Sequence, residues 1–245
     1  SVTALGTLKV GDININGSVS GSSNYIIPSL SSGQFLTTNG TSMSWGQLSA
    51  QAGLRSIQVW TSNGTWSKPS GVETISVTVT GAGGGGSGFC ESGGAGGTTK
   101  RVIDVTNVSS VSVTVGNPGG GTNYSGCGGN GNTSSFGSYC SASGGYGANC
   151  RQQHAGGIGG NGSGGNLNVY GGGGSGHGSY HTYGNHASGV SYFGGGQPSS
   201  NNQRNYAHRH QSHAAWGSGG NGTRESNRGA RGREGVVVVY EYYGG

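Results

Sequence analysis

Apolar and polar residues alternate over several short stretches of the chain. Ile75, Val77 and Val79 alternate with hydroxyl residues, which is the period-two pattern of a strand with one buried face. The stretches 101–105 and 111–115 repeat this pattern. These stretches predict a β framework in the middle of the chain.

A further strand is predicted near the C-terminal end. The continuous run from Val236 to Val239 is typical of a strand that is buried on both faces. We therefore predict one glycine-rich domain over 57–245, with a small β platform made of 57–115 and 235–243. A long insertion, 116–234, would interrupt this platform.

Residues 1–56 form a separate segment with few apolar side chains. Two short stretches with strand patterns meet at Asn39-Gly40, the dipeptide that most strongly favours a tight hairpin. The apolar content is too low for an independent core. We expect this segment to bury its few apolar side chains against partner chains.

Glycine dominates the insertion, and the whole chain contains 59 glycines in 245 residues. It recurs every third residue from Gly156 to Gly165 and again from Gly229 to Gly235. Three residues per turn is the period of an extended polyproline-type helix. We predict a packed bundle of short polyglycine-II-like helices, in a fold that is mostly β with irregular extended structure and little or no α-helix.

The alternative for the insertion is a flexible glycine-rich linker. Against a linker, apolar side chains are expected to close off the segments, namely Ile158, Leu167, Val169 and Phe193.

The chain has a formal net charge of +5. The stretch 105–224 contains no Asp, Glu or Lys. Glycosidases need two carboxylates, and calcium sites consist mainly of carboxylate oxygens. The sequence also lacks the nucleophile-elbow and zinc-protease motifs. We therefore expect no enzyme activity and no cofactor.

The cysteines are candidates for disulfide bonds, and three histidines are weak candidates for a metal site. The cysteines are Cys90, Cys127, Cys140 and Cys150, so disulfides among them and buried thiols both remain open. Weak candidates for a metal site are His208, His210 and His213. No carboxylate stands near these histidines, so we expect no metal.

The stretches between the glycine runs carry the bulky side chains. Tyr, Ser, Gly, Asn, Arg and Trp together are typical of binding loops, where rigid aromatic rings give a large contact area. We expect 177–216 to contact a ligand. The candidate binding residues are Tyr180, His181, Tyr183, His186, Tyr192, Phe193, Arg204, Tyr206, His208, Arg209, His210 and Trp216.

Two parts of the sequence are similar to known phage proteins. The stretches 1–13 and 33–45, the latter reading Gly-Gln-Phe-Leu-Thr-Thr-Asn-Gly-Thr-Ser-Met-Ser-Trp, resemble repeated elements of tailed-phage fibre proteins, notably those of cyanophages. Residues 57–245, with Trp66-Ser67-Lys68-Pro69 and the closing Gly235 to Tyr240, resemble the glycine-rich domain of fibre tips.

This resemblance implies a bacteriophage tail fibre tip, an adhesin or receptor-binding protein used in host recognition. It implies that 1–56 is a fibre, trimerisation or attachment segment and that 57–245 is the tip domain. It implies a virion location, extracellular after release, and a homotrimer that binds other fibre or tail proteins. The receptor would be an outer-membrane protein or a polysaccharide of the bacterial surface, and no nucleic acid is expected as a partner. No signal peptide and no transmembrane segment is visible in the sequence.

Two other functions remain open from the sequence. A purely structural fibre or virion protein would share the framework but would not bind a receptor. A glycine-rich RNA-associated protein would use segments such as Arg228-Gly229-Ala230-Arg231-Gly232-Arg233. The low density of basic residues disfavours this second alternative.

Overall fold

A computed structural model of the chain describes residues 53–88, 90–123, 126–149, 155–176, 187–196, 214–223 and 228–244, together with the backbone of two strands at 34–38 and 43–47. The chain divides into two compact units, Ser1–Ala50 and Gln51–Gly245. The described part is mostly β and contains no helix.

The described residues of the first unit form a hairpin. Strands β1 (Gln34–Thr38) and β2 (Met43–Gln47) pair antiparallel, with Thr38 opposite Met43. The pairing confirms the hairpin predicted around Asn39-Gly40.

The second unit contains two five-stranded antiparallel sheets. In the first sheet the order is β11-β6-β5-β12-β3, and in the second sheet it is β10-β9-β8-β7-β4. The strands are β3 (Leu54–Trp60), β4 (Gly64–Ser67), β5 (Val72–Thr80), β6 (Thr98–Asp104), β7 (Ser110–Thr114), β8 (Ser134–Phe136), β9 (Cys140–Ala142), β10 (Gly162–Ser163), β11 (Leu167–Val169) and β12 (Val236–Tyr243).

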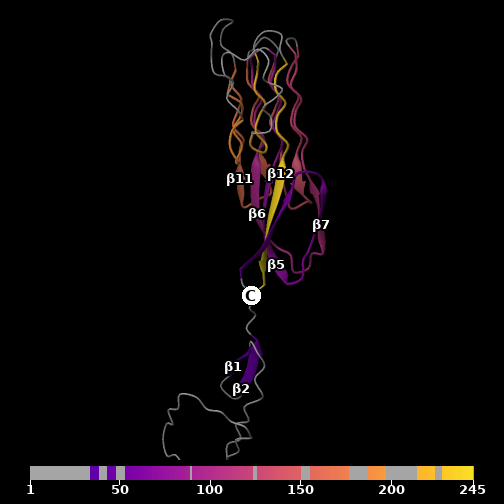
Figure 1. Cartoon of the computed structure of the whole chain (residues 1–245), viewed down its shortest axis with the longest axis vertical. Helices are drawn as coiled ribbons and strands as arrows, with labels where there is room; N and C mark the ends of the chain where they lie inside the picture. The colour runs from indigo at the N-terminus through magenta and orange to yellow at the C-terminus, as the bar shows by residue number, and fades with distance from the viewer. Residues whose placement is uncertain are drawn as a thin grey trace, which may run out of the picture. The chain divides into compact units, whose positions relative to one another are not determined.

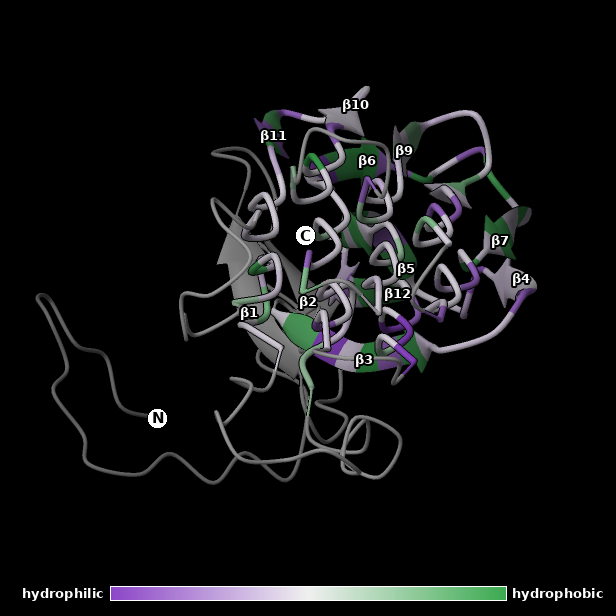
Figure 2. Cartoon of the chain, turned by 90° about the horizontal axis from the view of Figure 1, so that it is seen from above, coloured by the Kyte–Doolittle hydropathy of each residue, from purple (hydrophilic) through white to green (hydrophobic). Residues whose placement is uncertain are grey.

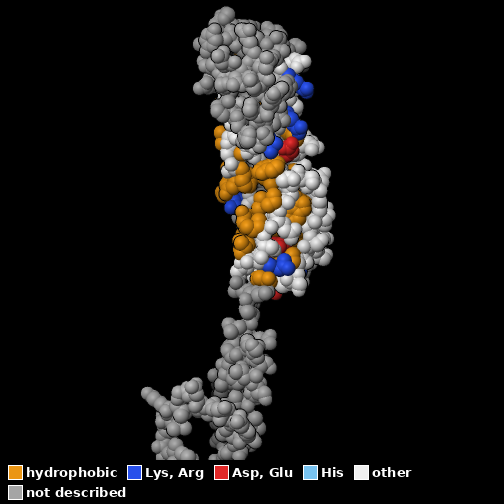
Figure 3. Space-filling model, viewed as in Figure 1, with side chains coloured by type: hydrophobic (Ala, Val, Ile, Leu, Met, Phe, Trp, Pro, Cys, Tyr) orange, Lys and Arg blue, Asp and Glu red, His pale blue; other side chains and the backbone are white. Residues whose placement is uncertain are grey.

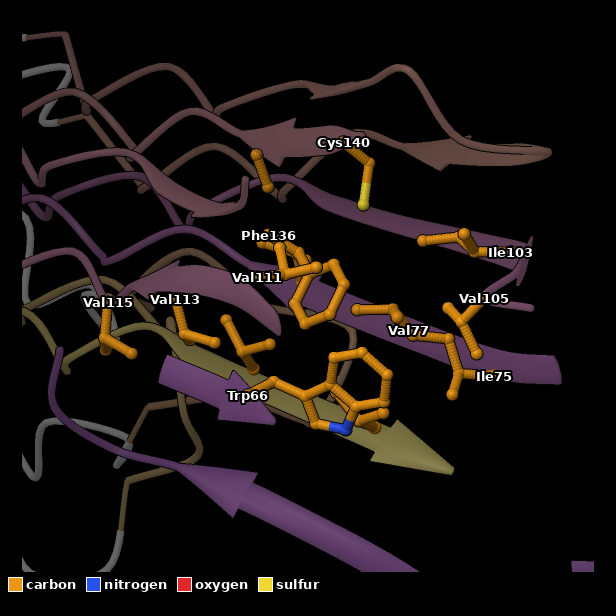
Figure 4. Close-up of a cluster of buried hydrophobic side chains, with 14 of the residues drawn as sticks. Trp66, Ile75, Val77, Ile103, Val105, Val111, Val113, Val115, Phe136 and Cys140 are labelled. Atoms are coloured by element: carbon orange, nitrogen blue, oxygen red, sulfur yellow. The ribbon is translucent and has the colours of Figure 1, made fainter. Parts of the chain in front are cut away.

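The two sheets bury one apolar core between them (Figure 4). Alternate residues of β5 and β12 point into it, and Trp66 and Phe136 enter from the second sheet with ring centroids 6.0 Å apart. The core consists of Trp66, Val72, Ile75, Val77, Val79, Ile103, Val105, Val111, Val113, Val115, Phe136, Cys140, Ala142, Val237 and Val239.

The predicted strand at Val236–Val239 is confirmed, and all four valines are buried. Val237 and Val239 belong to the core between the sheets, and Val236 and Val238 are buried on the opposite face of the strand. The range expected to form one insertion, 116–234, also supplies β8, β9, β10 and β11 to the two sheets.

Glycine-rich segments continue from the ends of the strands, in the direction away from the C-terminus (Figure 1). Seen from above, they appear end-on as small coils packed side by side (Figure 2). We call these segments the glycine array, and they comprise 81–88, 90–97, 115–123, 126–133, 143–149, 155–161, 170–176, 187–190, 217–223 and 228–235.

The backbone of the segment 82–87 bonds to neighbours on all sides with a period of three residues. Its amide donors reach 129–132 from Ala82 and Gly85, 230–233 from Gly83 and Gly86, and 91–94 from Gly84 and Ser87. Its carbonyls accept from 145–148, 119–122 and 220–223 in the same rotation. One segment therefore has six neighbours.

The segment 92–97 has a similar environment, donating to 172–175, 217–220 and 143–146. Such bonding satisfies backbone groups that are buried away from water. A three-residue period is also what polyglycine-II helices would give. The assignment of the array to that helix type stays a prediction.

Close packing requires glycine at the centre of the array. A Cβ placed on Gly84 would overlap the carbonyl oxygen of Tyr146, and one on Gly83 would overlap that of Ser218. The high glycine content thus allows neighbouring backbones to approach to hydrogen-bonding distance.

Candidate functional site

Two stretches of the predicted binding region, 177–186 and 197–213, lie outside the described residues, but the residues that flank them are described. Ser175 N–H donates to the carbonyl of Ala187 at 2.9 Å, which brings the two ends of the first stretch together. Ser92 donates to the carbonyl of Ser175, and Ser92 lies next to the 87–91 turn. The first stretch therefore leaves from the end of the array that is far from the sheets.

The residues that flank the second stretch lie at a different position along the array. Ala215 N–H donates to the carbonyl of Gly195 at 3.3 Å, so the ends of this stretch are also held together. Gly217 accepts a hydrogen bond from Gly96, two residues before β6 begins. The second stretch is therefore anchored beside the sheets, at the base of the array.

Tyr192 and Phe193 occupy a tight turn at this base. Ser191 and Gly194 exchange both backbone hydrogen bonds, at 2.8 and 3.1 Å, and so fix the turn. The two rings pack edge to face, 5.3 Å apart, and remain 48% and 41% exposed. The turn thus presents a fixed aromatic pair at the surface.

Trp216 lies against the same turn. Its carbonyl accepts a hydrogen bond of 2.6 Å from the hydroxyl of Ser191, and Arg233 stacks over its ring at 5.0 Å from the centroid. The structure therefore brings three of the predicted residues together around Ser191, namely Tyr192, Phe193 and Trp216.

The other predicted binding residues fall outside the described part of the chain. They are Tyr180, His181, Tyr183, His186, Arg204, Tyr206, His208, Arg209 and His210. The metal candidates His208, His210 and His213 fall there too. Within the described ranges, no group of three or more His, Cys, Asp or Glu side chains could hold a metal ion.

A family model for a glycine-rich domain matches residues 59–242. The chain belongs to this glycine-rich domain family. The match begins within β3 and ends within β12, so it covers both sheets and the whole array. A comparison with curated proteins gave no match.

The cysteines of the glycine-rich domain differ in state. Cys127 is disulfide-bonded, and Cys150 lies outside the described residues. Cys90 and Cys140 are buried and take no part in a disulfide. Burial raises the pKa of the Cys140 thiol to about 11, although the positive charge of Arg101 opposes the rise. A raised pKa disfavours the thiolate that a nucleophilic cysteine needs.

Sequence reasoning missed several surface residues of the glycine-rich domain. Lys100 on β6 lies over the ring of Tyr192, with its Nζ 5.6 Å from the centroid. Tyr170 follows β11 and is 74% exposed, and Val190 is exposed next to the aromatic turn. No local sequence pattern marks Lys100, because only the tertiary structure places it beside Tyr192.

Three of the four expected closing contacts are wrong. Ile158, Leu167 and Phe193 were expected to close off the glycine segments, but they are 72%, 51% and 41% exposed. Backbone hydrogen bonds close the array instead, which leaves these apolar side chains outside it. Among the described residues, no helix is long and apolar enough to cross a membrane.

Proposed function

We propose that this glycine-rich domain protein is the tip adhesin of a bacteriophage tail fibre. In this proposal it binds a receptor on the surface of a host bacterium through the stretches 177–186 and 197–213 and the aromatic turn. The protein would belong to the virion, assemble as a homotrimer with other fibre or tail proteins, and carry out no chemical reaction.

The closure of both stretches on a rigid base carries the proposal. Ser175 is bonded to Ala187, and Gly195 is bonded to Ala215, so each stretch starts and ends at a fixed point. The array that holds these fixed points is hydrogen-bonded on all sides. Variable loops on a rigid scaffold are the usual arrangement for binding surfaces, and these loops are rich in Tyr, Asn and His.

The aromatic turn adds support of a second kind. Tyr192 and Phe193 are fixed by the Ser191–Gly194 bonds and yet remain partly exposed. Because ordered aromatic rings lose little entropy on binding, they make effective contact residues. The receptor would be an outer-membrane protein or a surface polysaccharide.

The RNA-associated alternative has less support. Arg231 and Arg233 lie 3.3 and 3.4 Å from the carboxylate of Glu234, and Arg228 donates to the carbonyl of Gly121. The arginines of this segment therefore already bind groups of the protein itself, namely a backbone carbonyl of the array and the carboxylate of Glu234. A purely structural fibre role remains the main competitor, and it predicts no cell binding.

The test is cell binding by the labelled full-length protein against a panel of bacterial strains. One variant has 177–186 scrambled, a second has 197–213 scrambled, and a control has the exposed hydroxyls Thr65 and Ser112 of the second sheet changed to Ala. We expect strain-selective binding that the control retains and that at least one scrambled variant loses. Absence of binding to every strain, or equal binding by all folded variants, would favour the structural role.

A further inference from the structure

The outer faces of the two sheets differ in their exposed side chains. On the second sheet, the outward positions of the strands carry only hydroxyl side chains, namely Thr65, Ser67, Ser110, Ser112, Thr114, Ser135, Ser141 and Ser163. This is the pattern expected of a sheet face in water. The outer face of the second sheet therefore shows which side chains a water-exposed sheet face carries in this protein, and the first sheet can be compared with it.

The outer face of the first sheet carries exposed apolar side chains on β3, β6 and β11, whereas the outward positions of β5 are Thr74, Ser76 and Thr78. It exposes Leu54, Ile57, Val59, Val102 and Leu167, each between 50% and 59% exposed, and we call these five residues the apolar face. Figure 3 shows hydrophobic side chains gathered on the side of the molecule where β11, β6 and β12 lie in Figure 1. Tyr192 and Phe193 extend this surface, because Tyr192 lies beside Lys100 of β6.

The size of this surface matches a protein interface. Seven half-exposed large side chains expose on the order of 600 Å² of apolar area, if each contributes roughly 80–100 Å². The largest apolar patch on a monomer is about 300–600 Å², and a stable interface buries about 800 Å² per partner, of which somewhat more than half is apolar. The apolar face is thus large enough to be the centre of an interface.

The register of the first sheet indicates which residues would meet. Val59 and Leu167 lie at opposite edges of one cross-strand row, which runs through Val238, Thr78 and Lys100. Ile57 and Val102 belong to the next row, through Tyr240 and Ser76. Rotation about an axis parallel to the strands leaves each row at the same position along that axis. It would therefore set Val59 of one copy beside Leu167 of the next, and Ile57 beside Val102.

The charges on this face are compatible with such packing. Lys100 and Asp104 are its charged residues and both lie on β6, whereas the outward positions of β3 and β12 are uncharged. An axis parallel to the strands would place β6 of one copy against β12 or β3 of another, so no like charges would meet.

We propose that the apolar face is an interface between copies of this chain, packed around an axis parallel to the strands. Each copy would cover the apolar side chains of its neighbour, and the arrays of all copies would point in one direction. This orientation agrees with the proposed receptor binding, although the interface does not depend on it.

The test is disulfide cross-linking in the full-length protein carrying both Val59→Cys and Leu167→Cys. Within one copy these positions lie on the two edge strands, about 19 Å apart at a strand spacing of about 4.8 Å. A disulfide needs Cα atoms within about 7 Å, so a bond between these positions must join two copies. We expect covalent dimers and larger species on a non-reducing gel after mild oxidation, and none from either single variant.

A matched control carries Thr65→Cys and Ser163→Cys, at the two edge strands of the hydroxyl-lined sheet. It should give less than about a tenth of the cross-linked product, because its cysteines lie outside the interface. In the Val59→Cys and Leu167→Cys protein, adding Val102→Asp should abolish the product, whereas adding Ser112→Asp should leave it unchanged.

Three results would overturn the interface: no cross-linking in the folded double variant, equal yields from both cysteine pairs, or a covalent dimer from Val59→Cys alone. The last result would mean that copies meet in another orientation. None of these results depends on cell binding, so the interface and the receptor function can fail separately.

Discussion

Glu241 is a buried carboxylate in a strand that otherwise reads as apolar. Its oxygens accept hydrogen bonds from Trp66 Nε1 at 2.7 Å, Gln58 Nε2 at 2.6 Å and the hydroxyl of Ser56, and Arg55 lies 3.6 Å away. A buried charge is tolerated only when it is paired and hydrogen-bonded. Glu241 therefore joins β12, β3 and β4 at one point between the sheets.

Replacing Glu241 with Gln should destabilise the protein by about 3 kcal/mol, because one amide hydrogen-bond donor would then face the donors of Trp66 and Gln58. Urea unfolding followed by tryptophan fluorescence measures this change. The control is Glu73→Gln on the exposed side of β5, which should alter stability by less than about 0.5 kcal/mol. Equal stability of the two variants would contradict the role given to Glu241.

Cys140 makes stability depend on pH in the alkaline range. Burial raises its pKa from 9.0 to about 11, so the folded protein keeps the thiol protonated while the unfolded chain loses the proton. The stabilisation is complete below pH 9 and is lost as the pH rises toward 11. Relative to Cys140→Ala, the natural protein should lose about 2 kcal/mol over this window. Parallel pH dependence in the two proteins would contradict the prediction.

At the scale of elements, the regular strands were predictable and the short ones were not. Ile75, Val77 and Val79 show period two, and the predicted strand is confirmed as β5. β8 and β10 are rich in Ser and Gly and carry no such pattern. They form because long-range pairing and the core residue Phe136 place them, which a local window of sequence does not record.

The candidate site was predictable only in outline. The stretches 177–186 and 197–213 stand out by their Tyr, His and Asn content, but nothing in the sequence shows that the residues flanking 197–213 lie beside the sheets rather than at the far end of the array. That position follows from the bonds of Gly96 and Ala215, which connect residues far apart in the chain. The exposure of Leu167 also follows from the tertiary structure, since an apolar side chain alone predicts burial.

The segments of the array should differ sharply in their tolerance of a methyl group. Gly84→Ala would drive a Cβ into the carbonyl of Tyr146, whereas a Cβ on Gly120 meets nothing within 4 Å. We expect Gly84→Ala to cost at least about 3 kcal/mol or to prevent folding, and Gly120→Ala to change stability by less than about 1 kcal/mol. Thermal unfolding of both variants measures the difference. Similar melting temperatures would show that the array is loosely packed.

At the scale of the whole molecule, the array and the sheets form one hydrogen-bonded structure. β5 runs directly into 81–88, and 228–235 runs directly into β12. The side chains of Thr78 and Thr80 on β5 are buried, and Thr80 lies against the array at Gly217. Loss of the array would therefore expose part of the first sheet, so the two parts should unfold together.

Hydrogen exchange can test this cooperativity directly. The amides of Gly83 to Gly86 are buried and each donates to a neighbouring segment, so they should open only when the protein unfolds globally. Their protection should therefore lie within about tenfold of that of the β5 amides, as measured by mass spectrometry of overlapping peptides. A flexible glycine-rich linker would instead exchange at least about a thousandfold faster than β5, since its backbone would be bonded to water. Slow exchange would mean that the array can hold loops as firmly as a sheet does, which a receptor-binding surface anchored at Ser175 and Ala187 requires.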